Sequence, residues 1–138
     1  MKISARVNNS EGQHQVSLST DDHAHPLAVA PKASGYGSSV NGGELLFLAL
    51  ATCYCNDIYR EAAKRAIKVE SVEVEVRGDF GAEGEPAANV VYRARVTAHA
   101  GQEAIRALMQ ATDRVAEIQN TLRVGTPVGL NQIEAVSV

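Results

Sequence analysis

The sequence predicts a single α+β domain, and two patterns are the basis for this. Apolar and polar residues alternate in four short segments, as in strands with one buried face: residues 2–7, 14–19, 69–76 and 90–99. Two longer segments have helical composition and contain no proline: residues 42–67 and 102–120. The order of two strands, a helix, two strands and a helix is typical of mostly antiparallel sheets packed on helices.

The first 43 residues are predicted to form a hairpin followed mainly by loop. The two strands flank a polar turn, Asn-Asn-Ser-Glu-Gly, at residues 8–12. Residues 20–43 then contain two prolines and four glycines, which interrupt regular structure. We therefore expect loop over this segment, with one short strand at residues 27–30.

Residues 42–67 are predicted to be one long helix that must be covered on several sides. Ala, Leu, Glu, Lys and Arg dominate it, and neither Gly nor Pro follows Gly43 within it. Between Leu45 and Ile58 it is apolar on most of its circumference. Because one small sheet covers a single side, we expect a homodimer in which the long helices of two copies pack together across a two-fold axis.

The alternating segments after this helix are predicted to pair as a β-hairpin. Valines occupy one face of its first strand, and Glu73 and Glu75 lie on the other face. The second strand presents Arg93 and Arg95 on its polar face. Opposite charges across a strand pair contribute roughly 0.2–1 kcal/mol each, so we expect these side chains to form ion pairs on the exposed face.

The C-terminal part is predicted to be a second helix and a last strand. Ile105, Leu108 and Val115 recur at near-helical spacing within residues 102–120. The tail at residues 127–138 is predicted to be a strand. The whole chain, residues 1–138, is then expected to be one domain, since domains of roughly 100–150 residues are common.

Charge and hydropathy argue against several classes of partner. The formal net charge is −3, which does not suggest binding to nucleic acid or to an anionic membrane. The longest apolar run, residues 45–51, is far shorter than the roughly 20 residues that span a bilayer. The N-terminus has no apolar run of the kind found in a signal peptide. We therefore expect a soluble, cytoplasmic protein.

Both cysteines lie on the predicted long helix, and their thiols face opposite sides of it. Cys53 and Cys55 are about 200° apart around the helix, so a disulfide between them requires local unwinding. Cys55 shares its side with apolar residues, which predicts a packing role. Cys53 lies where apolar residues give way to polar ones. Arg60 would favour its thiolate, and Asp57 would oppose it unless it pairs with Arg60. Both a reactive and a packing role remain open for Cys53 on these grounds.

The residues around Cys53 resemble the first-cysteine helix of the OsmC/Ohr family of osmotically inducible and organic hydroperoxide resistance proteins. The matching positions are Asn41, Glu44, Leu45, Leu46, Ala49, Ala51 and Cys53, with a Gly- and Ser-rich loop at residues 35–39 before them and Asn120-Thr121-Leu122 far downstream. The resemblance implies an intertwined homodimer in which sheets wrap two long central helices. It also implies a thiol-dependent peroxidase for organic hydroperoxides or hydrogen peroxide, with Cys53 as the peroxidatic thiol.

The supporting residues of that family pattern are absent or displaced in this chain. Aligned on Asn120-Thr121-Leu122, the family's resolving cysteine falls at residues 116–117, which are Ala and Glu. The family's glutamate falls on Gly43, one residue before Glu44. Its loop arginine falls at residues 13–14, where this chain has Gln and His. Arg60, on the helix itself, is the candidate cation.

Glu44 has two interpretations. It lies nine residues before Cys53, roughly 13 Å along a continuous helix and on the opposite face, so it can reach a thiol only across a dimer. A carboxylate near a helix N-terminus is also favoured by the helix dipole, which gives Glu44 a purely structural role.

The sequence supports two hypotheses of function. The first is thiol-dependent reduction of organic hydroperoxides in an oxidative stress response. Cys53 is its nucleophile, Glu44 and Arg60 are its supporting groups, and the reductant is an external thiol or Cys55 after distortion of the helix. The alternative is a non-catalytic OsmC-like homodimer that binds a small apolar or thiol-reactive ligand in a pocket at the interface.

One further pattern concerns metal binding. His23 and His25 form an HxH pair beside Asp21 and Asp22, and such residues can bind a divalent metal. No further ligands are evident in the sequence, so we expect a solvated loop there. Neither a metal nor a cofactor is expected for this chain.

Overall fold

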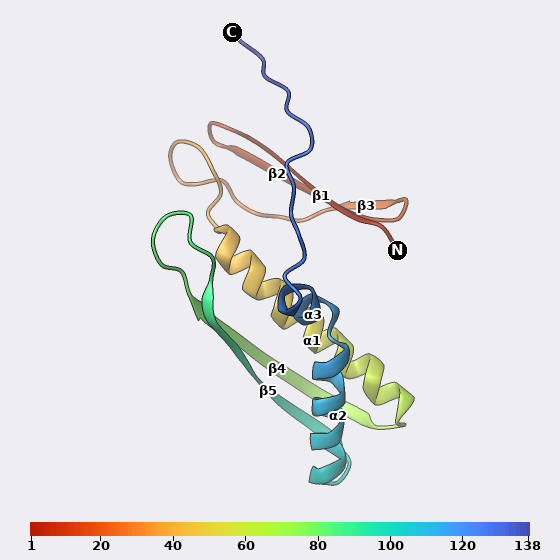
Figure 1. Cartoon of the computed structure of the whole chain (residues 1–138). Coiled ribbons are helices and arrows are strands. Elements are labelled where there is room, and N and C mark those ends of the chain that lie inside the picture. Colours follow the sequence, from red (N-terminus) through yellow and green to blue (C-terminus); the bar gives the residue numbers. More distant parts are fainter. The chain divides into compact units, whose positions relative to one another are not determined.

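The computed structural model describes residues 1–138, and it divides into two compact units, residues 1–46 and 47–138 (Figure 1). The elements in chain order are β1 (Ile3–Ser10), β2 (Gln13–Thr20), β3 (His23–Pro26), α1 (Gly42–Lys64), β4 (Lys68–Asp79), β5 (Ala88–His99), α2 (Gln102–Val115) and α3 (Glu117–Arg123). This mixture of helices and antiparallel strands confirms the predicted α+β class. The expectation of one domain stays a prediction, because α1 begins in the first unit and continues through the second.

The first unit contains a three-stranded antiparallel sheet in the order β1-β2-β3. β1 and β2 pair along their full lengths, from Ile3 opposite Thr20 to Ser10 opposite Gln13. The predicted hairpin is therefore confirmed, with longer strands and a tighter turn than expected. Gly12 closes that turn with a φ of +70°, a left-handed conformation that glycine adopts without strain.

The third strand lies earlier in the chain than predicted. Residues 27–30 form no strand, whereas His23–Pro26 pairs with β2. The reason is the short turn at residues 21–22, which places the following residues directly opposite the end of β2. Pro26 lies at the end of this ladder, because proline has no backbone N–H to continue it. His23 and His25 consequently lie on an exposed strand, and the loop predicted for them is wrong.

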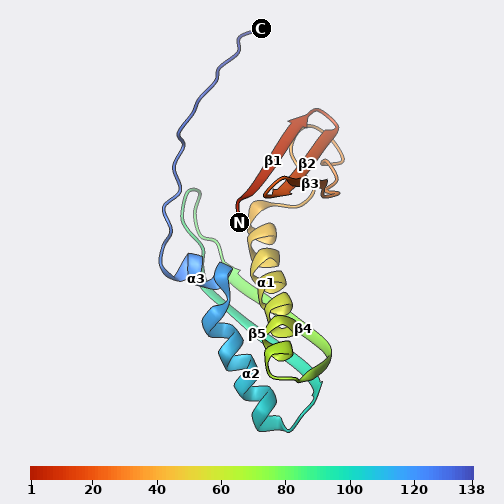
Figure 2. The same cartoon turned by 90° about the vertical axis from the view of Figure 1, so that its right-hand side faces the viewer.

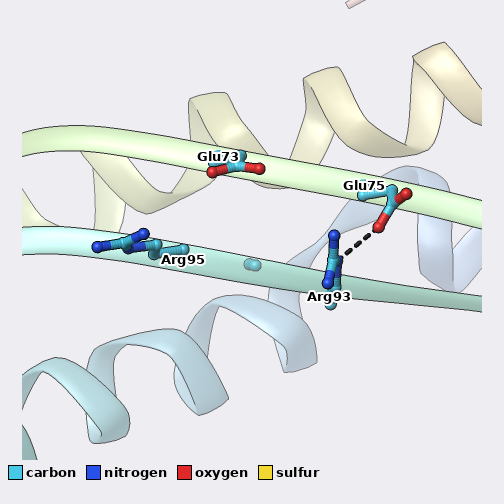
Figure 3. Close-up of a pocket in the computed structure, with 5 residues that line it drawn as sticks. Glu73, Glu75, Arg93 and Arg95 are labelled. Atoms are coloured by element: carbon cyan, nitrogen blue, oxygen red, sulfur yellow. Dashed lines mark ion pairs between the residues drawn. The ribbon is translucent and has the colours of Figure 1, made fainter.

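In the second unit, β4 and β5 form the predicted hairpin. Glu75 lies opposite Arg93 and Glu73 opposite Arg95 in the register. The Nε atom of Arg93 lies 2.5 Å from Oε2 of Glu75, and Figure 3 shows these two side chains pointing toward each other. The charged side chains line a shallow depression of about 370 Å³ on the polar face of the hairpin.

The core of the second unit lies on the apolar face of this hairpin. Its fully buried residues are Tyr54, Ile58 and Ala62 from α1 and Leu108 from α2. The hydroxyl of Tyr54 donates a hydrogen bond of 2.9 Å to the carbonyl of Met109, which links the two helices. Helices α1 and α2 therefore pack on the same face of the β4–β5 hairpin (Figure 2). None of the helices combines the length and the apolar character that a membrane span needs.

The predicted helix over residues 102–120 is broken in two. Ala116 has extended backbone angles, φ −68° and ψ 106°, and separates α2 from α3. Tertiary contacts explain the break, because Ala116 is fully buried and Gln119 is 4 % exposed. The Nε2 atom of Gln119 donates a 2.9 Å hydrogen bond to the carbonyl of Leu50 in α1. If α2 continued straight through Ala116, Gln119 would not be held at this position against Leu50.

The strand predicted at residues 127–138 is absent. These residues have no regular structure, and apolar side chains such as Leu130 (83 % exposed) and Ile133 (78 % exposed) face solvent. A strand requires a neighbour to pair its N–H and C=O groups, and this chain offers the tail none. The strand predicted at residues 127–138 from the alternation of apolar and polar residues is therefore wrong for this chain.

Candidate functional site

The candidate site is built around Cys53, which lies half-buried near the middle of α1. Its Sγ atom lies 3.5 Å from Oδ2 of Asp57, one helical turn later. The same sulfur lies 3.9 Å from Oε2 of Glu117, the first residue of α3. The break at Ala116 thus brings a carboxylate from α3 to the thiol on α1.

Arg60 joins the two carboxylates on their other side. Its Nη1 atom lies 3.0 Å from Oδ1 of Asp57 and 3.1 Å from Oε1 of Glu117. Asp57 is 5 % exposed, so its charge is nearly removed from water, whereas the side chain of Glu117 is 63 % exposed. We call Cys53, Asp57, Arg60 and Glu117 the thiol–carboxylate cluster.

The surroundings of Cys53 act against its ionisation. Burial raises the pKa of its thiol, and the negative charges of Asp57 and Glu117 raise it further. A hydrogen bond from the backbone N–H of Ile118 acts in the opposite direction and favours the thiolate. The thiol is therefore mostly protonated at neutral pH. The backbone N–H of Ile118 is the one donor that would stabilise the negative charge of the thiolate.

The two carboxylates of the cluster differ in their protonation. Burial, followed by the hydrogen bond and the charge of Glu117, raises the pKa of Asp57. The backbone N–H of Glu117 lowers the pKa of its own side chain, and Arg60 lowers it further. Asp57 is consequently the group that holds a proton more readily, and Glu117 is the ionised partner of Arg60.

Gln119 holds the start of α3 beside the thiol. Its Nε2 bonds the carbonyl of Leu50, three residues before Cys53, while its Oε1 is buried without a hydrogen-bond partner. An unpaired buried carbonyl oxygen is uncommon in folded proteins. This contact fixes the distance between α1 and the residues that precede and follow Gln119 on α3.

The other site residues predicted from the sequence lie outside the cluster. Glu44 accepts a 2.9 Å hydrogen bond from the backbone N–H of Asn41, and Asn41 Oδ1 accepts one of 2.9 Å from the backbone of Glu44. This reciprocal pair is a capping box, which gives Glu44 a structural role at the start of α1, and a role at a partner's thiol stays a prediction. Cys55 is half-buried on the other side of α1 and is not among the residues that surround Cys53.

The side of α1 that carries Cys55 was predicted to be a core stripe, and this is confirmed only in part, because Ile58 and Ala62 are buried. Leu48 and Tyr59 lie on the same side, since eleven residues complete about three turns, and they are 58 % and 45 % exposed. The buried face is centred instead on Tyr54, Ile58 and Ala62. Cys55 therefore lies at the border of an exposed apolar stripe.

A second hollow lies between β5 and α2, and the polar groups that line it serve as structural hydrogen-bond partners. It measures about 550 Å³ and includes Tyr54, Tyr92 and Asp113 in its lining. Burial raises the pKa of Tyr54 to about 12 and raises that of Tyr92 as well. The hydroxyl of Tyr92 donates to Asp113, which also pairs with Arg123 at 2.7 Å. Both hydroxyls stay protonated at neutral pH and serve as hydrogen-bond donors.

Sequence reasoning gave Cys53 and Arg60 as site residues and left out Glu117 as a contributor. The only signal for Glu117 was the alignment that placed the family's second cysteine at residues 116–117. The structure brings that position within 3.9 Å of the Cys53 sulfur, with a carboxylate in place of a thiol.

The fold and the site define an α+β protein with a free thiol in the middle of a long helix. The chain belongs to the OsmC-like protein family, whose model matches residues 35–131. The family resemblance stated from the sequence is thereby confirmed. No curated protein matches the chain in sequence.

Solved structures agree with this fold. An OsmC-like protein from Mycoplasma pneumoniae has a TM-score of 0.60 at 18 % identity, covering 91 % of this chain and 87 % of the other. An OsmC-like protein of unknown function from Vibrio cholerae gives 0.59 at 16 % identity, over 88 % and 93 %. An organic hydroperoxide resistance protein, OsmC, from Legionella pneumophila gives 0.58 at 20 % identity, over 89 % and 90 %.

Proposed function

We propose that this protein reduces organic hydroperoxides with Cys53 as its nucleophile and an external thiol as its reductant. The main support is the thiol–carboxylate cluster, in which a half-buried thiol lies beside two carboxylates that pair with a guanidinium on their other side. Further support comes from the family, since the similar Legionella protein is described as an organic hydroperoxide resistance protein.

The cluster places two carboxylates and one backbone donor beside the sulfur for the first step. The Cys53 sulfur attacks the distal oxygen of the hydroperoxide as the O–O bond breaks, which gives a sulfenic acid and an alcohol. The thiol proton ends on the departing alkoxide, and Asp57 and Glu117 lie within 3.9 Å of the sulfur to relay it. The N–H of Ile118 stabilises the thiolate as it forms.

The second step needs thiols from outside the chain. Two external thiols reduce the sulfenic acid, which restores Cys53 and yields a disulfide and water. Cys55 faces the other side of α1, and the residue that α3 presents to the sulfur is Glu117. An internal disulfide would require α1 to unwind at Cys53.

The same proposal includes a homodimer formed along α1. Leu48 and Tyr59 make an exposed apolar stripe on this helix, and Cys55 lies beside them. Exposed apolar side chains along one side of a helix support packing against another helix there. A second copy of α1 would cover it. Sedimentation of a stable monomer at micromolar concentration would rule this dimer out.

A second candidate is a non-catalytic dimer that binds a small apolar or thiol-reactive ligand. The observation in its favour is the raised pKa of Cys53, which lowers the thiolate fraction that a peroxidase uses. Under this candidate the thiol contributes to a binding pocket and reacts slowly.

Peroxide consumption separates the two candidates. Purified protein is given cumene hydroperoxide with dithiothreitol or dihydrolipoate as reductant. The peroxidase proposal expects turnover by the wild type, loss of turnover in Cys53→Ser and near-normal turnover in Cys55→Ser. Consumption no faster than the blank by the wild type would reject the peroxidase and favour the binding protein.

A further inference from the structure

Three possible metal ligands face one another inside the thiol–carboxylate cluster. Cys53 Sγ lies 3.5 Å from Asp57 Oδ2 and 3.9 Å from Glu117 Oε2, and all three ligand atoms lie within 4.8 Å of one another. Arg60 contacts the other oxygen of each carboxylate, Oδ1 and Oε1. The three inner atoms are therefore free of the guanidinium.

The two separations that involve the sulfur are close to the edges of a metal tetrahedron. With zinc–sulfur and zinc–oxygen bonds of about 2.3 and 2.0 Å, the sulfur and an oxygen ligand lie about 3.5 Å apart. One observed separation equals that value and the other exceeds it by a few tenths of an ångström. Three ligands on one face of a tetrahedron leave its fourth position for water, as in catalytic zinc sites.

The charges of the cluster also suit a divalent cation. With the thiol ionised, Cys53, Asp57 and Glu117 bring three negative charges together, and Arg60 supplies a single positive one. A divalent ion would balance the remaining two. Asp57 is the most buried of the three ligands, at 5 % exposed, and its ligand oxygen lies within 4.8 Å of that of Glu117.

The unpaired amide oxygen of Gln119 is a second observation, made on the helix that carries Glu117. Gln119 lies two residues after Glu117, and its Nε2 is bonded to the carbonyl of Leu50, three residues before Cys53. Its Oε1 is buried and lacks a donor. A buried acceptor without a protein donor is the kind of group that an ordered water molecule satisfies.

Arg60 fits such a site as an outer partner of the ligands. Carboxylates that bind metals are commonly held in place by a second hydrogen bond on their other oxygen. Arg60 makes that bond to both carboxylates, at 3.0 and 3.1 Å. The ligand oxygens are thereby oriented before any ion arrives.

We propose that Cys53, Asp57 and Glu117 form a three-ligand site for a divalent transition metal of the zinc class, with water as the fourth ligand. A single thiolate with two carboxylates suits an ion of intermediate softness such as Zn²⁺. Binding converts the thiol to a metal-bound thiolate and releases its proton. Because the bound sulfur is no longer free to attack a peroxide, the metal would also inhibit turnover; this consequence alone rests on the proposed function.

The test is a Co²⁺ titration of the reduced protein, residues 1–138, followed by absorption spectroscopy. We expect a sulfur-to-cobalt charge-transfer band, tetrahedral cobalt bands in the visible range, saturation at one ion per chain and displacement by Zn²⁺. Cys55→Ser should retain all four features, and Cys53→Ser should lose the charge-transfer band. Glu117→Gln, a change at an exposed side chain, should weaken Co²⁺ binding by at least about tenfold.

Several outcomes would overturn the site. These are absence of a charge-transfer band in the wild type at millimolar Co²⁺, loss of the band in Cys55→Ser, or unchanged affinity in Glu117→Gln. Replacing both His23 and His25 by Ala controls for ions held on the exposed strand β3, and should leave the band unchanged. The titration uses no peroxide, so a failure of the metal site and a failure of the peroxidase proposal are read separately.

Discussion

Glu117 presents its carboxylate 3.9 Å from the sulfur of Cys53, although 64 residues separate them in the chain. The contact depends on the end of α2 at Val115 and on the burial of Ala116, which turns the chain toward α1. It places a negative charge where a thiolate would form. The reactivity of this thiol should therefore respond directly to the charge at residue 117.

Replacing Glu117 by Gln should make Cys53 more reactive. The charge of Glu117 helps to raise the pKa of the thiol, so its removal lowers that pKa and increases the thiolate fraction near neutral pH. We expect labelling by Ellman's reagent to become severalfold faster in a Cys55→Ser background, since charge effects at a partly exposed site are on the order of 1 kcal/mol. Glu103→Gln, at an exposed position on α2, is the matched control and should have no effect. Slower labelling in Glu117→Gln would contradict the geometry of the cluster.

Replacing Arg60 by Met should destabilise the fold most at neutral pH. The variant keeps the apolar stem and removes the partner of Asp57, which is 5 % exposed. We expect a measurable loss in the free energy of unfolding, smaller than for a fully buried pair because the Arg60 side chain is 43 % exposed. Since Asp57 has a raised pKa and loses the group that lowers it, the loss should shrink as acid protonates Asp57. Urea unfolding at several pH values measures this, with Arg106→Met as control. A loss that grows toward acid pH would argue against the ion pair.

Glu61 should make the stability of the protein depend on acid pH. Hydrogen bonds from Lys64 and then Arg65 lower its pKa from 4.5 to about 2. A lowered carboxyl pKa contributes stability that is present above the unfolded value and is lost as pH falls through the folded one. The advantage of the wild type over Glu61→Gln should thus be full near neutral pH and decline between about pH 4.5 and pH 2. Equal differences at pH 6 and pH 2.5, measured by urea unfolding, would show that Glu61 does not act through its charge.

Gly78 should tolerate no side chain. A Cβ atom at this position would lie 2.9 Å from Cζ of Phe47, 3.0 Å from a methyl group of Val90 and 3.2 Å from the carbonyl oxygen of Ala88. Overpacking of this kind typically costs about 1–3 kcal/mol, and we expect that loss for Gly78→Ala. Gly101→Ala is the control, because nothing lies within 4 Å of a Cβ there. Equal urea midpoints for the two variants would mean that Phe47 moves aside without cost.

The strands and the long helix could be predicted because local patterns determine them. Alternation located both hairpins, and the charge pattern on β4 and β5 anticipated the pair between Glu75 and Arg93. The break at Ala116 could not be predicted, because no proline or glycine marks it. It follows from the contact of Gln119 with Leu50, 69 residues away. The tail misled the prediction because alternation indicates a strand without supplying the neighbour that a strand requires.

The candidate site was predictable only in part, for the same reason. Cys53, Asp57 and Arg60 lie within two turns of one helix, so their spacing placed them together. Asp57 was anticipated as a charge that opposes the thiolate unless it pairs with Arg60. The structure shows that pair together with Glu117, which no local pattern could bring to the thiol. The expectation of no metal considered the histidine pair with Asp21 and Asp22, and did not consider the proposed ligands Cys53, Asp57 and Glu117 on two helices.

The extended backbone of Ala116 has a consequence for how chemistry can vary on this scaffold. The main chain places residue 117 beside the sulfur. The side chain at this position, together with Asp57, therefore determines which groups contact the thiol. A carboxylate at this position can accept a proton or bind a metal ion, whereas a cysteine there could form a disulfide with Cys53. One substitution at residue 117 can therefore change the chemistry of the site without a change in the fold around it.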